Sequence, residues 1–99
     1  MKLSNKQIKY LKTLAHDKKP VVIIGGNGLT DGVINETDIV LETHELVKIK
    51  VNADSKDERM AMVEKLTEAT ESNFIQLIGK IAILYRQRPK NPTIELPKK

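Results

Sequence analysis

The sequence predicts an α/β (α+β) fold of two layers, in which helices pack on a four-stranded mixed sheet in the order α-β-α-β-α-β-β. Three observations predict this fold. Apolar residues recur at helical spacing in three segments, short apolar or alternating runs lie between and after them, and glycine or proline marks several junctions. We expect one domain over residues 1–88. Residues 89–99 form a polar, proline-containing tail that is expected to be extended rather than packed.

The first helix is expected over residues 5–17. Ser4 and Gln7 stand at the spacing of a capping box, in which each side chain bonds the other residue's backbone N–H. Apolar residues then share one helical face, and lysines project from the opposite face. Pro20 separates this helix from an apolar strand at residues 21–24.

The second helix is expected to begin after Thr30, whose hydroxyl can cap it, and to end near His44. Its expected buried stripe consists of Val33, Ile34, Thr37, Val40 and Leu41. The next strand, residues 46–51, alternates apolar residues with Lys48 and Lys50. Because side chains alternate across a strand, these two lysines must share one side of the sheet.

A second capping pattern begins at Ser55 and predicts a third helix to about Glu71. The apolar runs 74–78 and 81–85 flank a two-residue Gly-Lys link, which predicts an antiparallel hairpin. The first two strands enclose a helix and are therefore expected to be parallel. Helices are expected mainly on one face. Three of the strands are apolar almost throughout, so either something covers part of the second face or these strands are central.

Charge divides the chain into blocks. Residues 1–19 carry six lysines and one aspartate, whereas residues 20–45 carry five acidic residues and no lysine or arginine. This segregation indicates a molecule with a basic side and an acidic side, of which the basic side would meet a polyanion. The alternative is that the charge blocks simply follow solvated helix faces.

The composition excludes several classes of chemistry. The chain has no cysteine, so disulfides, thiolate metal sites and a cysteine nucleophile are excluded. It shows neither an apolar stretch of membrane-spanning length nor the apolar core of a signal peptide, and a cytoplasmic protein is expected. His16 and His44 have no evident nucleophile to pair with. We therefore expect no catalytic residue, no metal and no cofactor.

The most informative motif is the run Gly25-Gly26-Asn27-Gly28, between the first strand and Thr30. A Gly-x-x-Gly turn at this place exposes backbone N–H groups beside a helix N-terminus, which favours anions. Glycine also serves tight turns for purely local reasons. The run lacks the Lys-Ser/Thr ending of a P-loop and the third glycine of a dinucleotide site. In a basic chain, the expected anion is a nucleic-acid phosphate.

Phosphate binding needs cations and N–H groups more than a particular side-chain geometry. The candidate contacts are Gly25, Gly26, Asn27, Gly28, Lys2, Lys6, Lys9, Lys12, Lys18, Lys19, Lys48, Lys50, Lys80, Arg86 and Arg88. The chain has only three aromatic residues, too few for a stacking platform. Tyr85 is expected in the core, with stacking on a base as the alternative. Structured RNA, read by shape and backbone, is therefore the expected partner.

Three blocks of sequence together resemble one family. They are VVIIGGNGLT at residues 21–30, HELVKIKV at residues 44–51 and IGKIAILYR at residues 78–86. They resemble the CRM (chloroplast RNA splicing and ribosome maturation) domain, specifically the small bacterial YhbY type, from about Leu3 to Pro89. The resemblance implies a fold similar to the C-terminal domain of translation initiation factor 3. It also implies RNA binding through the Gly-x-x-Gly loop and association with precursors of the large ribosomal subunit.

One departure from the family affects this expectation. Some relatives carry a basic residue inside the loop, where this chain has Gly26 and Asn27. The first helix and the lysines of the second strand must then carry much of the affinity. The expected function is a non-catalytic RNA-binding accessory protein of ribosome assembly, with large-subunit rRNA as partner and neither DNA nor a membrane. The alternative is a protein-interaction module that acts through the acidic surface of the second helix.

Overall fold

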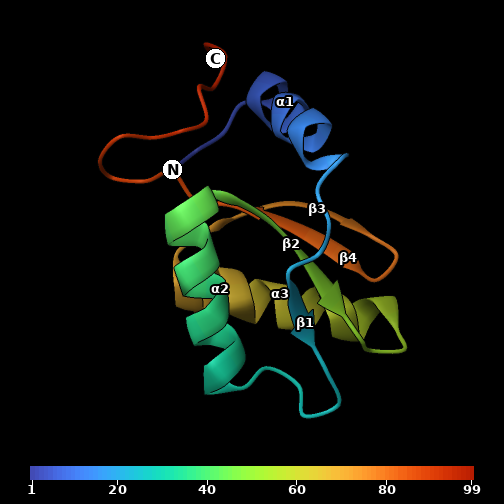
Figure 1. The fold of residues 1–99 in the computed structure, drawn as a ribbon. Helices are drawn as coiled ribbons and strands as arrows, with labels where there is room; N and C mark the ends of the chain where they lie inside the picture. The colour runs from blue at the N-terminus through green and yellow to red at the C-terminus, as the bar shows by residue number, and fades with distance from the viewer.

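The computed structural model describes residues 1–99, and its elements follow the predicted order (Figure 1). They are α1 (Asn5–Ala15), β1 (Val22–Ile24), α2 (Asp31–His44), β2 (Leu46–Val51), α3 (Lys56–Thr70), β3 (Asn73–Ile78) and β4 (Ile81–Tyr85). The strands form one sheet in the order β1-β2-β4-β3. β1 is parallel to β2, and the other neighbours are antiparallel. The predicted mixed sheet, parallel pair and hairpin are confirmed.

Each helix begins at a side-chain cap. The Gln7 N–H donates to the Ser4 hydroxyl at 3.2 Å, and the Ser4 N–H donates to the Gln7 side-chain oxygen at 3.0 Å. The hydroxyls of Thr30 and Ser55 each accept a hydrogen bond from the N–H three residues further on. These bonds satisfy N–H groups that the first turn of a helix leaves without an intrahelical partner.

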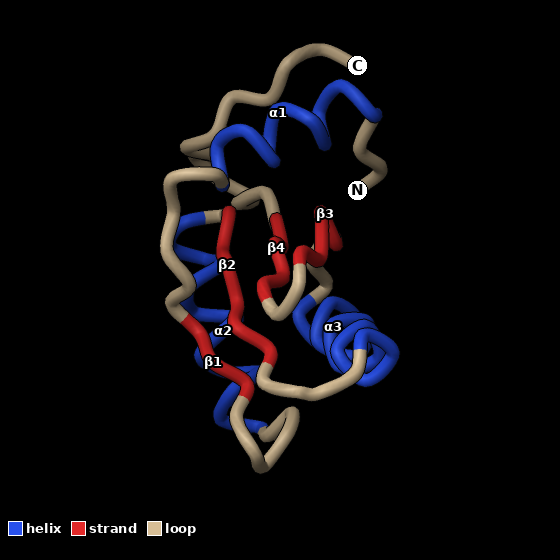
Figure 2. The backbone as a smooth tube through the Cα atoms, turned by 90° about the vertical axis from the view of Figure 1, so that its right-hand side faces the viewer, coloured by secondary structure: helices blue, strands red, loops and turns tan.

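The sheet has a separate core on each face. On one face α2 and α3 pack against the sheet. The core between them comprises Val22, Ile24, Leu41, Val47, Ile49, Val51, Val63, Leu66, Ala82 and Leu84. On the other face α1 and the C-terminal segment pack against the sheet (Figure 2). The core there comprises Leu11, Ala15, Leu46, Ile75, Ile83 and Tyr85. The two central strands, β2 and β4, contribute to both cores. Two helices therefore share one face, and the expectation that something covers part of the second face is confirmed. The alternative that the three apolar strands are central is wrong for β1 and β3, which are the edges of the sheet.

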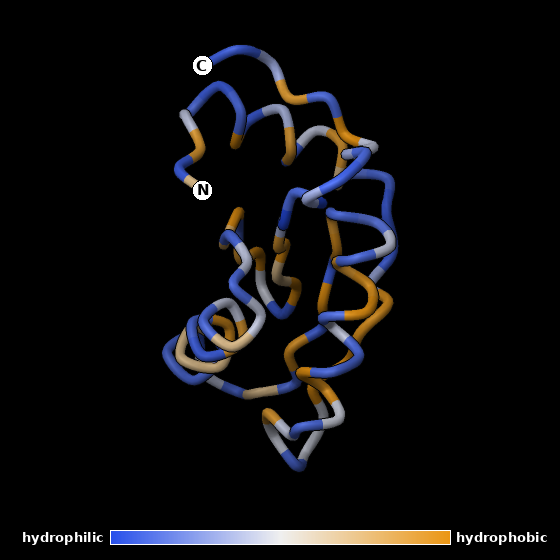
Figure 3. The backbone as a smooth tube through the Cα atoms, turned by 90° about the vertical axis from the view of Figure 1, so that its left-hand side faces the viewer, coloured by the Kyte–Doolittle hydropathy of each residue, from blue (hydrophilic) through white to orange (hydrophobic).

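The helix α1 covers only one end of its face of the sheet. Its apolar residues face the strands, and its outer turns are hydrophilic (Figure 3). It packs over the end of the sheet that contains Leu46 and Tyr85. The opposite end, where the loop between β1 and α2 lies, is far from α1 (Figure 1). On the part of this face that α1 leaves uncovered, Ile23 and Ile78 are both exposed.

A buried carboxylate joins the C-terminal segment to the sheet. Glu45, between α2 and β2, is completely buried and has a φ of 65°. Its carboxylate accepts hydrogen bonds from the N–H groups of Arg88, Thr93 and Ile94 and from the Thr93 hydroxyl, at 2.6 to 2.9 Å. Burial raises the pKa of Glu45, but these hydrogen bonds outweigh burial and bring the pKa below its ordinary value of 4.5.

The expectation of an unpacked tail is wrong. Residues 89–99 contain no helix or strand, as expected, but Ile94 and Leu96 pack against the core under α1. The Gln7 side-chain amide also donates a hydrogen bond to the Pro97 carbonyl at 3.0 Å. The polar composition of the segment concealed this packing, because the anchor is the distant carboxylate of Glu45.

Tyr85 lies in the core, as expected, and is not available for stacking. Its hydroxyl is buried without a hydrogen-bond partner. Burial raises the pKa of Tyr85 to about 12, and the negative charge of Glu45 adds to this shift.

We expect Glu45→Gln to lower the free energy of unfolding by about 2–4 kcal/mol at neutral pH, because a buried charge that accepts four hydrogen bonds is lost. The pKa of Glu45 is lower in the folded than in the unfolded protein. The stabilisation is therefore complete above pH 4.5 and is lost as the pH falls through the folded-state pKa. Urea unfolding at neutral pH and at about pH 3 measures this.

The matched control is Glu95→Gln, because Glu95 is an exposed carboxylate of the same segment. It should change the free energy of unfolding by less than about 0.5 kcal/mol. A Glu45→Gln effect that is equal at both pH values would contradict the assigned role of the carboxylate.

Candidate nucleic-acid interface

The loop after β1 presents main-chain N–H groups to solvent. The Gly28 N–H donates to the Gly25 carbonyl at 3.0 Å and closes a turn, whereas the N–H groups of Gly26 and Asn27 have no acceptor within the protein. Both of these residues are exposed. The capped N-terminus of α2 follows directly and adds its partial positive charge. The loop can therefore donate main-chain hydrogen bonds to an anion.

The glycines of this loop have different roles. Gly28 has a φ of 74°, a conformation that other residues rarely adopt, so the turn itself requires glycine there. A Cβ atom added at Gly25 or Gly26 would meet no atom within 4 Å. Glycine at those two positions is not needed for packing. Instead it leaves the backbone open to close approach by a ligand.

Lys50 and Lys80 lie at the same end of the sheet as the loop. The Asn52 N–H donates to the Ile24 carbonyl at 3.0 Å, which holds the end of β2 beside the end of β1. The Val51 N–H donates to the Lys80 carbonyl at 2.7 Å, which places the β3–β4 turn beside the same strand. The structure thus brings together parts of the predicted site that are distant in sequence.

The remaining predicted lysines form a second group at the α1 end. They are Lys2, Lys6, Lys9 and Lys12 on or just before α1, and Lys18 and Lys19 after it, all exposed. Lys48 extends from β2 and donates a hydrogen bond to the His16 carbonyl at 3.3 Å. Figures 1 and 2 show α1 and the loop at opposite ends of the molecule. The predicted cations therefore form two groups, with Lys48 on the sheet between them.

Arg86 does not belong to either group. The Arg86 guanidinium donates to the Asp38 carboxylate and carbonyl, to the Thr70 carbonyl at 2.8 Å and to the Glu42 carboxylate at 3.4 Å. Its side chain is only 20% exposed. Arg86 thus connects the end of α3 to α2 and is already bonded to acidic groups. The backbone of Arg88 bonds to Glu45.

Lys65 is a cation beside the loop that the sequence pattern does not indicate. Lys65 on α3 lines an open hollow together with Leu29, Met62 and the carboxylate of Glu58. The Met62 methyl carbon lies 4.0 Å from where a Cβ of Gly28 would stand, so this part of α3 adjoins the loop. No local pattern identifies Lys65, because its place beside the loop depends on how α3 packs on the sheet.

The acidic block lies on the opposite side of the sheet from α1. The exposed carboxylates of α2 are Asp31, Glu36, Asp38 and Glu42. The helix α2 packs on the face that α1 does not cover. The predicted division into a basic side and an acidic side is therefore present in the fold. No group of three His, Asp or Glu side chains is placed to hold a metal ion. None of the helices has the length and apolarity needed to cross a membrane.

Comparisons with known proteins agree on one family. A family model described as the CRS1 / YhbY (CRM) domain matches residues 3–86. A Haemophilus influenzae protein named "RNA-binding protein" is 41% identical over 97 residues, covering 98% of this chain and 97% of its own length. A Pseudomonas aeruginosa protein named "probable RNA-binding protein" is 41% identical over 90 residues, covering 91% of this chain and 86% of its own.

A solved structure agrees with these relatives. It is the solution structure of a hypothetical protein from Staphylococcus aureus that is provisionally described as RNA-binding. It superimposes with a TM-score of 0.85 at 38% sequence identity, covering 97% of this chain and all of the other. At this level of likeness, the fold predicted for this chain is confirmed.

We expect Arg86→Ala to lower the free energy of unfolding by about 2–3 kcal/mol, because the Thr70 carbonyl and the Asp38 carboxylate lose a charged, mostly buried partner. Thermal or urea unfolding measures the change. Arg88→Ala is the matched control, since only the backbone of Arg88 makes a hydrogen bond. Equal stability of the two variants would contradict the structural role of Arg86.

Proposed function

The chain belongs to the CRS1 / YhbY (CRM) domain family, and from this premise we propose that it is a non-catalytic RNA-binding protein that assists assembly of the large ribosomal subunit in the cytoplasm. Its partner would be structured rRNA in a precursor particle. Relatives that it matches over most of their length carry names that state RNA binding. Association with the ribosome goes beyond those names, and it is proposed because the chain resembles bacterial YhbY-type proteins.

The observation that carries the proposal is the open backbone of the loop at residues 25–28. Gly26 and Asn27 offer N–H groups without a protein acceptor, and no side chain closes the approach at Gly25 or Gly26. Hydrogen bonds from backbone N–H groups to phosphate oxygens are a common part of nucleic-acid binding. Lys50 and Lys80 add positive charge at the same end of the sheet.

The second group of lysines determines which RNA shape fits. The molecule is 39 Å along its longest axis, and α1 and the loop lie at opposite ends of the molecule (Figures 1 and 2). One RNA that contacts both groups must present phosphates over a comparable distance. A folded RNA with a helical segment satisfies this requirement, and its affinity would depend strongly on salt concentration.

The acidic surface of α2 has fewer unpaired carboxylates available to a partner than the sequence suggested. Two of its carboxylates, those of Asp38 and Glu42, are bonded to Arg86. The protein-interaction alternative therefore has fewer free charges to use. Free fragments of large-subunit rRNA should bind tightly under the proposed function and negligibly under this alternative.

We expect Gly26→Val to weaken binding of large-subunit rRNA fragments by about tenfold or more, because a branched side chain keeps phosphates away from the N–H groups of the loop. The melting temperature should not change, since a Cβ at Gly26 meets no atom. Filter binding and thermal unfolding measure the two quantities. Gly28 is unsuitable for this test because its φ of 74° makes any side chain strained. Unchanged RNA affinity in Gly26→Val would show that the loop is only a turn.

Crosslinking in cells tests the proposed partner directly. We expect ultraviolet crosslinks between large-subunit rRNA precursors and peptides that contain the loop at residues 25–28 or the lysines of α1. Sequencing of the crosslinked RNA and mass spectrometry of the linked peptides identify both sides. Crosslinks confined to α2, or the absence of rRNA from the crosslinked material, would contradict the proposal.

A further inference from the structure

An open groove lies between α1 and the uncovered part of the sheet. Its volume is about 380 Å³, within the range of roughly 300–1,000 Å³ that is usual for small-ligand sites. Isoleucines of the β3–β4 hairpin form its floor, and polar residues of α1, β2 and β3 form its walls. The lining residues are Ile78, Ile81 and Ile83 on the floor, and Lys12, Thr13, His16, Lys48 and Gln76 around it.

The floor of the groove is apolar surface without a partner in the fold. Ile78 is 58% exposed although it belongs to a strand, and it stands opposite Ile81 in the hairpin. It remains exposed because α1 ends at Ala15 and covers only the other end of this face. An apolar floor with polar walls is typical of a ligand site.

The walls of the groove favour an anionic ligand. Lys12 and Lys48 both line it, and no carboxylate does. Lys48 uses one hydrogen bond on the His16 carbonyl and retains further donors. Lys50 lies next along the same side of β2, where it pairs with Ile81.

The walls also contain uncharged hydrogen-bonding groups. The Thr13 hydroxyl donates to the Lys9 carbonyl and can still accept a hydrogen bond. The Gln76 amide lines the groove and can both donate and accept. Groups of this kind suit a planar ring whose edge carries both nitrogen and oxygen atoms.

We propose that this groove holds one unpaired RNA nucleotide, with its base against Ile78 and Ile81 and its phosphate beside Lys12 and Lys48. A nucleotide has a flat base that suits the apolar floor. The polar edge of its base suits the uncharged wall groups, and its phosphate suits the lysines. Apolar side chains can hold an extruded base without an aromatic partner. The inference rests on the RNA-binding function proposed above and adds recognition of an unpaired base, which backbone contacts at the loop cannot provide.

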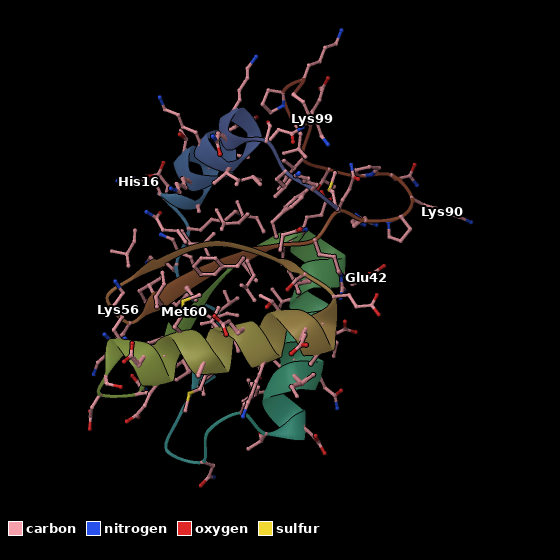
Figure 4. All side chains as sticks on the ribbon, turned by 180° about the vertical axis from the view of Figure 1, so that it is seen from behind. His16, Glu42, Lys56, Met60, Lys90 and Lys99 are labelled. Carbon is pink, nitrogen blue, oxygen red and sulfur yellow. The ribbon has the colours of Figure 1, made fainter.

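The position of the groove supports this assignment. Lys50 pairs with Ile81 on one side and with Ile23 of β1 on the other, and β1 leads into the loop at residues 25–28. The opposite wall belongs to α1, near His16 (Figure 4). An RNA that contacts both groups of lysines therefore passes over the groove.

Two hairpin RNAs and two variants of the full chain test the site. One RNA has a single unpaired purine in its stem, and the other has the same stem fully paired. The test variant is Ile78→Ser. Its control is Ile39→Ser, because Ile39 is 66% exposed on α2, outside the groove. Neither substitution changes the charge or removes a buried side chain, so both proteins should fold and keep their attraction to phosphates.

We expect the unchanged protein to bind the bulged hairpin about tenfold more tightly than the paired one. Ile78→Ser should remove most of this preference and leave affinity for the paired hairpin unchanged, whereas Ile39→Ser should alter neither. In methyl NMR spectra, the signals of Ile78 and Ile81 should shift on addition of the bulged hairpin, and that of Ile39 should not.

Equal binding of the two hairpins by the unchanged protein would overturn the groove site and leave the proposed function standing. A preference that Ile78→Ser does not reduce would also overturn it, and this is the result expected if the groove serves a partner protein. Binding of neither hairpin would overturn the proposed RNA-binding function itself.

Discussion

The buried carboxylate of Glu45 holds together parts of the chain that would otherwise separate. Its side chain accepts four hydrogen bonds from the segment that follows β4, and its main-chain carbonyl accepts one from Arg86. These bonds direct Ile94 and Leu96 onto the core beneath α1. Because α1 forms one wall of the groove, the geometry of that groove depends in part on the Glu45 carboxylate, which anchors the segment that packs beneath α1.

The sheet also separates opposite charges. The lysine-bearing helix α1 lies on one face, and the acidic helix α2 lies on the other. Arg86 neutralises part of the acidic face by bonding to Asp38 and Glu42. Such a separation of charge would orient an approaching polyanion toward the lysines of α1 and away from the carboxylates of α2.

Much of the fold could be predicted because its signals are local. The capping residues Ser4, Thr30 and Ser55 mark where helices begin, and strand alternation placed Lys48 and Lys50 on one face. The candidate site was predictable only as a list of residues. Arg86 was included because it is basic, yet its partners are on distant elements. Lys65 was omitted because nothing near it in sequence indicates that α3 adjoins the loop.

The sequence by itself determined the order of helices and strands, the Gly-x-x-Gly loop and the blocks of charge along the chain. These properties follow from short-range spacing and from the conformational freedom of glycine. Only the tertiary structure decided that the tail packs, that the lysines form two separate groups and that an apolar groove lies between them. Those outcomes depend on which surfaces of the sheet α1 and the tail leave uncovered, and contacts between distant residues determine that coverage.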